Sequence, residues 1–118
     1  MRIFVGVQSL LFLTATAAVA HAHASLAQAS PSVGSAISAP PQEVILTFTE
    51  RLEAAFSNVT VIDASGTEVS QGKVQVNDAT MRVSLKPLNA GIYQVNWRAV
   101  SSDTHKIEGS FTFRVDAQ

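Results

Sequence analysis

The chain has 118 residues with eight basic and nine acidic side chains, three histidines and no cysteine, so its formal net charge is −1. This length allows one small domain beside an export segment and excludes a second domain. The charge balance offers no basic patch for nucleic acid. Because no disulfide can form, packing alone or a bound ligand must hold the core.

The first 22 residues have the order of an export signal. A basic start, Met1-Arg2, precedes a mostly apolar run to Leu13 and mainly small residues to Ala20. The apolar run is too short for a membrane span, which needs about 20 mostly apolar residues. Cleavage after Ala20 and cleavage after Ala22 both satisfy the small-x-small rule, and the second makes His23 the first residue of the mature chain.

The rest of the chain has the pattern of an all-β protein. Runs that alternate apolar and polar residues cover Glu43–Thr49, Asn58–Asp63, Lys73–Val76, Thr80–Lys86, Ile92–Val100 and Ile107–Val115. Turn signals such as Ala64-Ser65-Gly66 separate them, and Leu52–Phe56 can form a helical turn at most. Ser30-Pro31 is expected to be an extended connection. The pattern predicts an antiparallel β-sandwich of about seven strands, with a small barrel as the main competitor.

The run Ser102-Asp103-Thr104-His105 lies between the strand that carries Trp97 and the strand that carries Phe111. In an extended segment, residues two apart point to the same side, so Asp103 and His105 are expected to project together while Thr104 faces away. Taken alone, such a pair is more often a turn with a side-chain hydrogen bond than a metal site. The aromatic alternation around Trp97 is most simply core packing.

The N-terminal histidines favour a metal site at Asp103 and His105 over a simple turn. If the mature chain begins at His23, its free amine and Nδ1 can chelate one cation, to which His105 adds a nitrogen and Asp103 an oxygen. A nitrogen-rich set with a carboxylate suits Cu(II), whereas Cu(I) prefers sulfur ligands. Cleavage after Ala20 would instead give His21-Ala22-His23, which could wrap Cu(II) or Ni(II) in a plane without His105.

Four stretches of the chain together suggest a known family. They are His23-Ala24-Ser25-Leu26 with Ser30-Pro31 following, Leu46-Thr47-Phe48-Thr49-Glu50, Ala90-Gly91-Ile92-Tyr93-Gln94-Val95-Asn96-Trp97-Arg98, and Ser101-Ser102-Asp103-Thr104-His105. In these stretches the chain resembles the CopC family of periplasmic copper-resistance proteins. The resemblance implies an antiparallel Greek-key β-sandwich, immunoglobulin-like or cupredoxin-like, in residues 23–118, and a cleaved signal in residues 1–22. It also implies one Cu(II) per mature chain, bound by His23, Asp103 and His105 in the periplasm. Glu50 matches a family position and is expected at best to support the ligands.

The chain departs from some members of this family in one loop, and the difference bears on which copper ion it is expected to bind. Some members of the family carry a methionine-rich loop that binds Cu(I), and the corresponding residues 62–78 hold no methionine or histidine. The resemblance therefore implies the Cu(II)-only form, which holds copper or delivers it for copper homeostasis and resistance. A CopD-like inner-membrane importer would be a separate chain, because no membrane span is expected after the signal. The competing hypotheses are a histidine-brace copper monooxygenase and a sandwich without metal.

Overall fold

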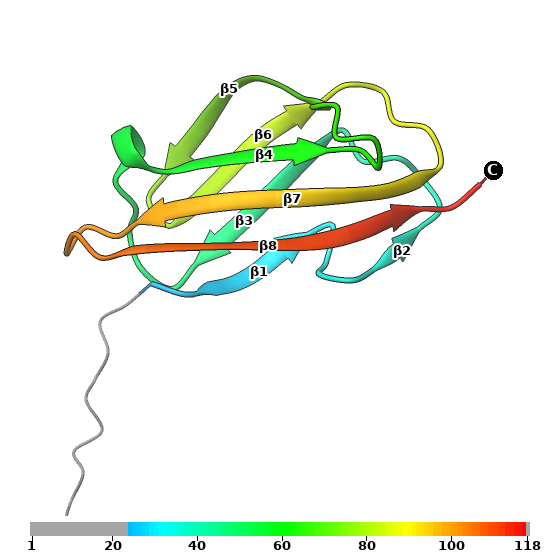
Figure 1. The fold of residues 1–118 in the computed structure, drawn as a ribbon. Coiled ribbons are helices and arrows are strands. Elements are labelled where there is room, and N and C mark those ends of the chain that lie inside the picture. The colour runs from blue at the N-terminus through cyan, green and yellow to red at the C-terminus, as the bar shows by residue number, and fades with distance from the viewer. Residues whose placement is uncertain (1–23, 118) are drawn as a thin grey trace, which may run out of the picture.

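The computed structural model describes residues 24–117, which form two stacked four-stranded sheets (Figure 1). One sheet has the strand order β1-β3-β6-β5 and the other β2-β8-β7-β4. The strands are β1 (Leu26–Ser30), β2 (Ala36–Ile37), β3 (Glu43–Phe48), β4 (Asn58–Ile62), β5 (Ser70–Asn77), β6 (Thr80–Leu85), β7 (Gly91–Val100) and β8 (Lys106–Val115). The predicted antiparallel sandwich is confirmed, although the two-residue strand β2 pairs with β8 in parallel.

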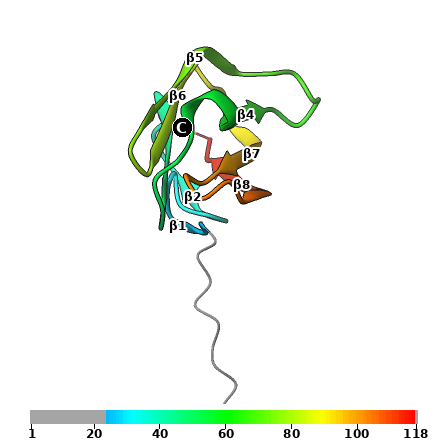
Figure 2. The ribbon, with the colours of Figure 1, turned by 90° about the vertical axis from the view of Figure 1, so that its left-hand side faces the viewer.

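Alternation along the strands decides which residues form the core between the sheets. In β3, Val44, Leu46 and Phe48 are at most 3% exposed, and the residues between them are half-buried on the outer face. Figure 2, an end-on view, shows the two sheets on opposite sides of this core. Met81, the one methionine after Met1, is fully buried within it. Burying a side chain such as Leu or Phe contributes about 1.5–3 kcal/mol, so packing can hold this domain without disulfides.

The structure also contains elements that the sequence pattern did not predict. Strand β1, which ends at Ser30, pairs with β3, although its own residues show no clean alternation of buried and exposed positions. Strand β5 begins three residues before the predicted Lys73. Its pairing with β6 has a register shift between Gln71 and Gln75, so no regular alternation of side chains marks its first residues. The helical turn expected in Leu52–Phe56 is confirmed as the 3-10 helix η1 (Ala54–Phe56). In the described part of the chain, no helix is long and apolar enough to cross a membrane.

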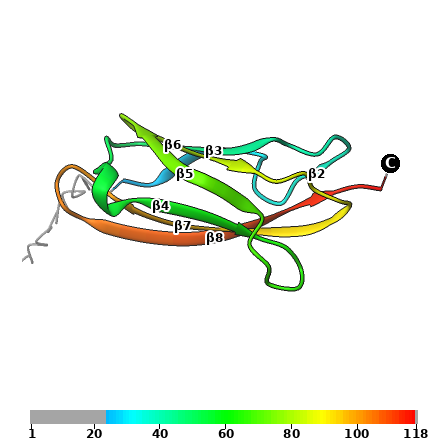
Figure 3. The ribbon, with the colours of Figure 1, turned by 90° about the horizontal axis from the view of Figure 1, so that it is seen from above.

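The beginning of β1 and the loop between β7 and β8 lie at the same end of the sandwich (Figures 1 and 3). The segment Thr49–Leu52 connects them. Thr49 exchanges two hydrogen bonds of 2.9 Å with Ser25, one through its hydroxyl oxygen and one through its amide. At the other end of the segment, Leu52 forms a β-bridge with Ser101. This bridging segment therefore ties the start of the folded chain to the loop that contains Asp103 and His105.

Candidate metal site

The loop that carries the predicted ligand pair is a tight turn at the tip of a long hairpin. Strands β7 and β8 pair without interruption from Gly91 and Val115 to Val100 and Lys106. Beyond them, the Ser101 amide donates to the carbonyl oxygen of His105 at 3.0 Å, and the Thr104 amide donates to the carbonyl oxygen of Ser101 at 2.8 Å. Thr104 has a φ of 71°, in the left-handed region that β-branched residues rarely occupy.

The turn, and not the strand alternation expected from the sequence, places Asp103 beside His105. The two side chains do lie together, but Asp103 and Thr104 are not in a strand, so strand alternation does not bring this about. The turn does, because Thr104 in its left-handed conformation reverses the chain between them. The result is a carboxylate and an imidazole on one side of a hairpin tip.

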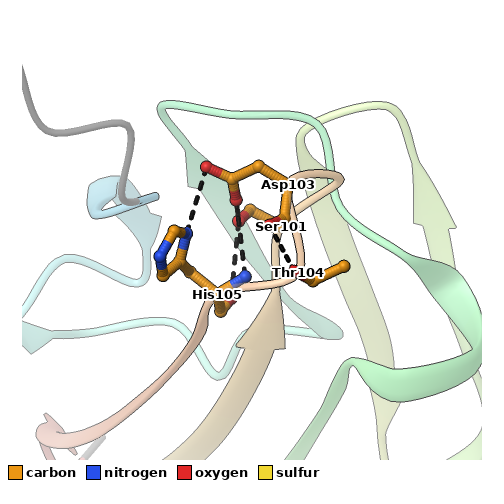
Figure 4. A network of polar contacts seen from close by, with 4 residues as sticks. All are labelled: Ser101, Asp103, Thr104 and His105. Carbon is orange, nitrogen blue, oxygen red and sulfur yellow. Dashed lines mark hydrogen bonds and ion pairs between the residues drawn. The ribbon is translucent and has the colours of Figure 1, made fainter.

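Both oxygens of the Asp103 carboxylate have partners within the loop (Figure 4). Oδ2 lies 3.2 Å from Nδ1 of His105. Oδ1 accepts a short hydrogen bond from the hydroxyl of Ser101 and a longer one, 3.4 Å, from the His105 amide. The side chains of Asp103 and His105 are 35% and 51% exposed, whereas Ser101 is fully buried. The side chains of Asp103 and His105 are therefore open to solvent, while the buried Ser101 hydroxyl holds the Asp103 carboxylate in place.

The contacts around Asp103 favour its charged form. The Ser101 hydroxyl and, after it, the His105 side chain hold the pKa of the Asp103 carboxyl below its ordinary value of 3.8. At neutral pH the loop thus presents an anionic oxygen beside an imidazole nitrogen. An imidazole nitrogen with a carboxylate oxygen suits a divalent transition-metal ion of intermediate softness, such as Cu(II) or Zn(II).

Two side chains are too few to hold such a cation firmly. Among residues 24–117, no group of three or more His, Cys, Asp or Glu side chains could form a metal site. The predicted third ligand, His23, lies outside the described residues, as does His21. The chain just after His23 is well anchored, since Ala24 is 2% exposed and Ser25 is hydrogen-bonded to Thr49. The ligand set of His23, Asp103 and His105 stays a prediction.

Two further residues singled out in the sequence lie near this end of the fold. Trp97 packs against the core, as predicted, with its ring edge-on to Phe48 at a centroid distance of 5.1 Å. Glu50 is half-buried within the bridging segment. The sequence pattern did not single out Ser101. The one signal for it is its position, two residues before Asp103 at the end of a core strand.

Comparison with known proteins identifies the family. The CopC domain matches residues 26–116, so the chain belongs to the CopC family. "Copper resistance protein C" of Pseudomonas syringae pv. tomato is 38% identical over 107 residues, covering 83% of this chain and 84% of that protein. "Copper transport protein CutJ" of Bacillus subtilis is 32% identical over 90% of this chain, which spans 20% of that longer protein.

Solved structures agree with the fold. CopC from Methylosinus trichosporium OB3b superposes with a TM-score of 0.72 at 32% identity, covering 81% of this chain and 96% of the other. PcoC, a methionine-rich copper resistance protein from Escherichia coli, gives a TM-score of 0.71 at 36% identity, covering 80% of this chain and all of the other. The sandwich architecture and the family assignment expected from the sequence are both confirmed.

Proposed function

We propose that this protein is an exported Cu(II)-binding protein of the periplasm, which holds or delivers one copper ion per chain. The ion would be bound by the amine and imidazole of an N-terminal His23, by Asp103 and by His105. Copper is the cargo of this site. Residues 1–22 would be the export signal, and their removal would create the amine ligand.

The observation that carries the proposal is the contact between Asp103 Oδ2 and His105 Nδ1, 3.2 Å long, on an exposed turn of a CopC domain. It is supported by the position of the first described residues at the same end of the sandwich (Figure 3). The names of the relatives, copper resistance and copper transport proteins, favour copper as the ion. The carboxylate and nitrogen donors favour Cu(II) over Cu(I), which prefers sulfur.

Titration of the chain that starts at His23 tests the site. We expect one Cu(II) per chain, measured in competition with a chelator, with a visible d-d band and an electron paramagnetic resonance spectrum typical of nitrogen and oxygen ligands. His105→Ala should lower the affinity by at least tenfold. Asp63→Asn is the matched control, since Asp63 is a half-buried aspartate whose carboxylate accepts hydrogen bonds within a different turn. Absence of a one-to-one site, or a site indifferent to His105→Ala, would contradict the proposal.

The N-terminal amine needs a separate experiment. Intact mass of the exported protein should give a chain that begins at His23. A chain carrying one extra alanine before His23 should lose most of its affinity, because its amine is displaced and the His23 nitrogen becomes an amide. If cleavage follows Ala20 instead, copper should bind at His21-Ala22-His23, and His105→Ala should have no effect.

A binding protein also accounts for the surface better than an oxygen-activating enzyme does. Among the described residues, Phe56 is the one aromatic among the exposed large hydrophobic side chains, so no flat aromatic face for a glycan is present there. The named relatives are copper resistance and transport proteins. Peroxide production with a reductant should therefore not exceed that of free copper. A CopD-like membrane importer is the partner that we propose for delivery.

A further inference from the structure

We infer that Ser101 is a positioning residue for the copper site: its hydroxyl holds Oδ1 of Asp103, so that the carboxylate binds the ion through Oδ2. This inference rests on the proposed function, since it concerns how one of the proposed ligands is oriented.

Ser101 is held rigidly beneath the exposed turn. It is fully buried, whereas the four residues after it, up to His105, are exposed. Its backbone is held by the β-bridge to Leu52 and by the hydrogen bond to the carbonyl oxygen of His105. The hydroxyl oxygen therefore has a fixed position, unlike the end of an exposed serine side chain.

The hydrogen bond from Ser101 leaves one particular oxygen of Asp103 for the ion. A serine hydroxyl has one proton to donate, and the hydroxyl of Ser101 donates it to Asp103 Oδ1. The carbonyl oxygen of His105 lies 3.4 Å from the same hydroxyl, at the limit for a hydrogen bond. The His105 amide adds a second, weaker donor to the same oxygen. Because Oδ1 accepts these hydrogen bonds, the oxygen that faces the His105 ring is Oδ2. A cation held between the two side chains would meet that oxygen.

Orientation of the Asp103 carboxylate by Ser101 should increase the affinity for Cu(II). Without the hydroxyl, the carboxylate could rotate on the exposed turn, and part of the binding free energy would be lost in ordering it again. Partners that orient metal ligands in this way typically contribute 10-fold to 100-fold in affinity. We therefore expect Ser101→Ala to weaken Cu(II) binding by about this factor.

The test compares two buried serines at the same end of β7. Ser57 is also buried, and its hydroxyl oxygen accepts a hydrogen bond from the Val100 amide without contacting Asp103. Ser101→Ala should weaken Cu(II) binding and shift the copper electron paramagnetic resonance parameters. Ser57→Ala removes the same atom and should leave both unchanged, whatever it does to stability. Equal effects of the two substitutions would overturn the inference.

A double-mutant cycle separates positioning from general damage. In the Asp103→Ala background, Ser101→Ala should cause no further loss of affinity, because the carboxylate that it orients is gone. A full additional loss there would overturn the inference. Ser101→Thr, which keeps the hydroxyl, guards against failure of the alanine variant to fold. It should retain the wild-type copper spectrum, and a spectrum shifted as far as that of Asp103→Asn would count against the inference.

The outcomes distinguish the two proposals. If the wild-type chain binds no Cu(II) at a one-to-one site, the proposed function fails. If the wild type binds and His105→Ala abolishes binding, but Ser101→Ala behaves as Ser57→Ala does, only the role of Ser101 fails.

Discussion

At the scale of single residues, the turn from Ser101 to His105 combines a strained backbone with an anchored carboxylate. Thr104 occupies the left-handed region, and Asp103 is fixed by a hydroxyl from the buried layer below. A residue in such a sparsely populated conformation costs of order 1–3 kcal/mol, which the surrounding structure must supply. The turn is therefore less stable than an unstrained turn would be, but it places the side chains of Asp103 and His105 together.

Replacing Thr104 by glycine should make the metal-free protein more stable. Release of the strain, about 1–3 kcal/mol, outweighs the loss of about 0.5–1 kcal/mol from the greater freedom of glycine in the unfolded chain. Thermal unfolding should show a net gain of about 1 kcal/mol, which raises Tm by roughly 4–8 °C for a domain of this size. Ser102→Gly in the same turn, where φ is not positive, should lower Tm. A decrease with Thr104→Gly would show that the residue is not strained.

The pH dependence of copper binding should follow the nitrogen ligands and not Asp103. The pKa of Asp103 is lowered, first by the Ser101 hydroxyl, so the carboxylate stays charged while the pH falls from neutral to about 5. Imidazoles as a class take up protons near about pH 6.5 and must lose them to bind the ion. Affinity measured between pH 5 and pH 7.5 should therefore fall as the pH decreases. Asp103→Asn should lower the affinity throughout this pH range, because a ligand oxygen loses its charge.

The same lowered pKa has a consequence for folding. A carboxyl group with a lower pKa in the folded state contributes stability that is complete above its unfolded value and is lost as the pH falls through its folded value. In the metal-free protein, Asp103 should therefore stabilise the fold at neutral pH and cease to do so only in acid, below its ordinary pKa of 3.8.

Among the elements, strands β7 and β8 are packed most tightly where the Trp97 ring of β7 lies against Gly109 of β8. Gly109 lies opposite Trp97 in the register, and a Cβ atom at Gly109 would come within 2.6 Å and 2.9 Å of two atoms of the indole ring. Glycine is needed there because the ring lies over the backbone of the partner strand. The packing of Trp97 also fixes where the hairpin crosses Phe48 of the opposite sheet.

Gly109→Ala should destabilise the protein by about 1–3 kcal/mol, since the indole ring or the strand must move. Urea denaturation checks this, with Ser110→Ala as a control on the exposed outer face, where changes usually stay within about 0.5 kcal/mol. In a Trp97→Phe background the cost of Gly109→Ala should shrink. An equal cost in both backgrounds would contradict the clash with the indole.

At the scale of the whole molecule, the proposed site joins the beginning of the domain to a loop near its end. The bridging segment Thr49–Leu52 contacts both parts through Ser25 and Ser101. An ion bound by His23, Asp103 and His105 would therefore close the end of the sandwich. Binding to the folded form alone stabilises it by mass action.

Cu(II) should raise the thermal stability of the chain that starts at His23. Free Cu(II) at 100 times its Kd adds about 2.7 kcal/mol at 25 °C, equivalent to a rise in Tm of roughly 10 °C or more. Differential scanning calorimetry at neutral pH checks this. The increase should be much smaller for His105→Ala and for the chain with an extra N-terminal alanine. An unchanged Tm at saturating Cu(II) would rule out a folded site.

The sequence predicted those parts of the fold in which side-chain alternation is strong. Strands β3, β4, β6, β7 and β8 were predicted to within one residue at each end, because each has a clear buried face. Strand β1 was missed because its residues are half-buried or exposed without a regular period, so only its pairing with β3 defines it. The contact of Asp103 with His105 was predicted from the wrong local conformation. The role inferred for Ser101 could not be predicted, since burial of one hydroxyl beneath a turn depends on the tertiary fold.

The burial of Met81 has a consequence for a protein that carries a redox-active ion. Copper that cycles between oxidation states generates oxidants, and cysteine and methionine sulfur are among their first targets where they are exposed. This chain has no cysteine, and in its described part its one methionine has no exposed surface. Peroxide formed near the metal would therefore find no accessible sulfur on residues 24–117.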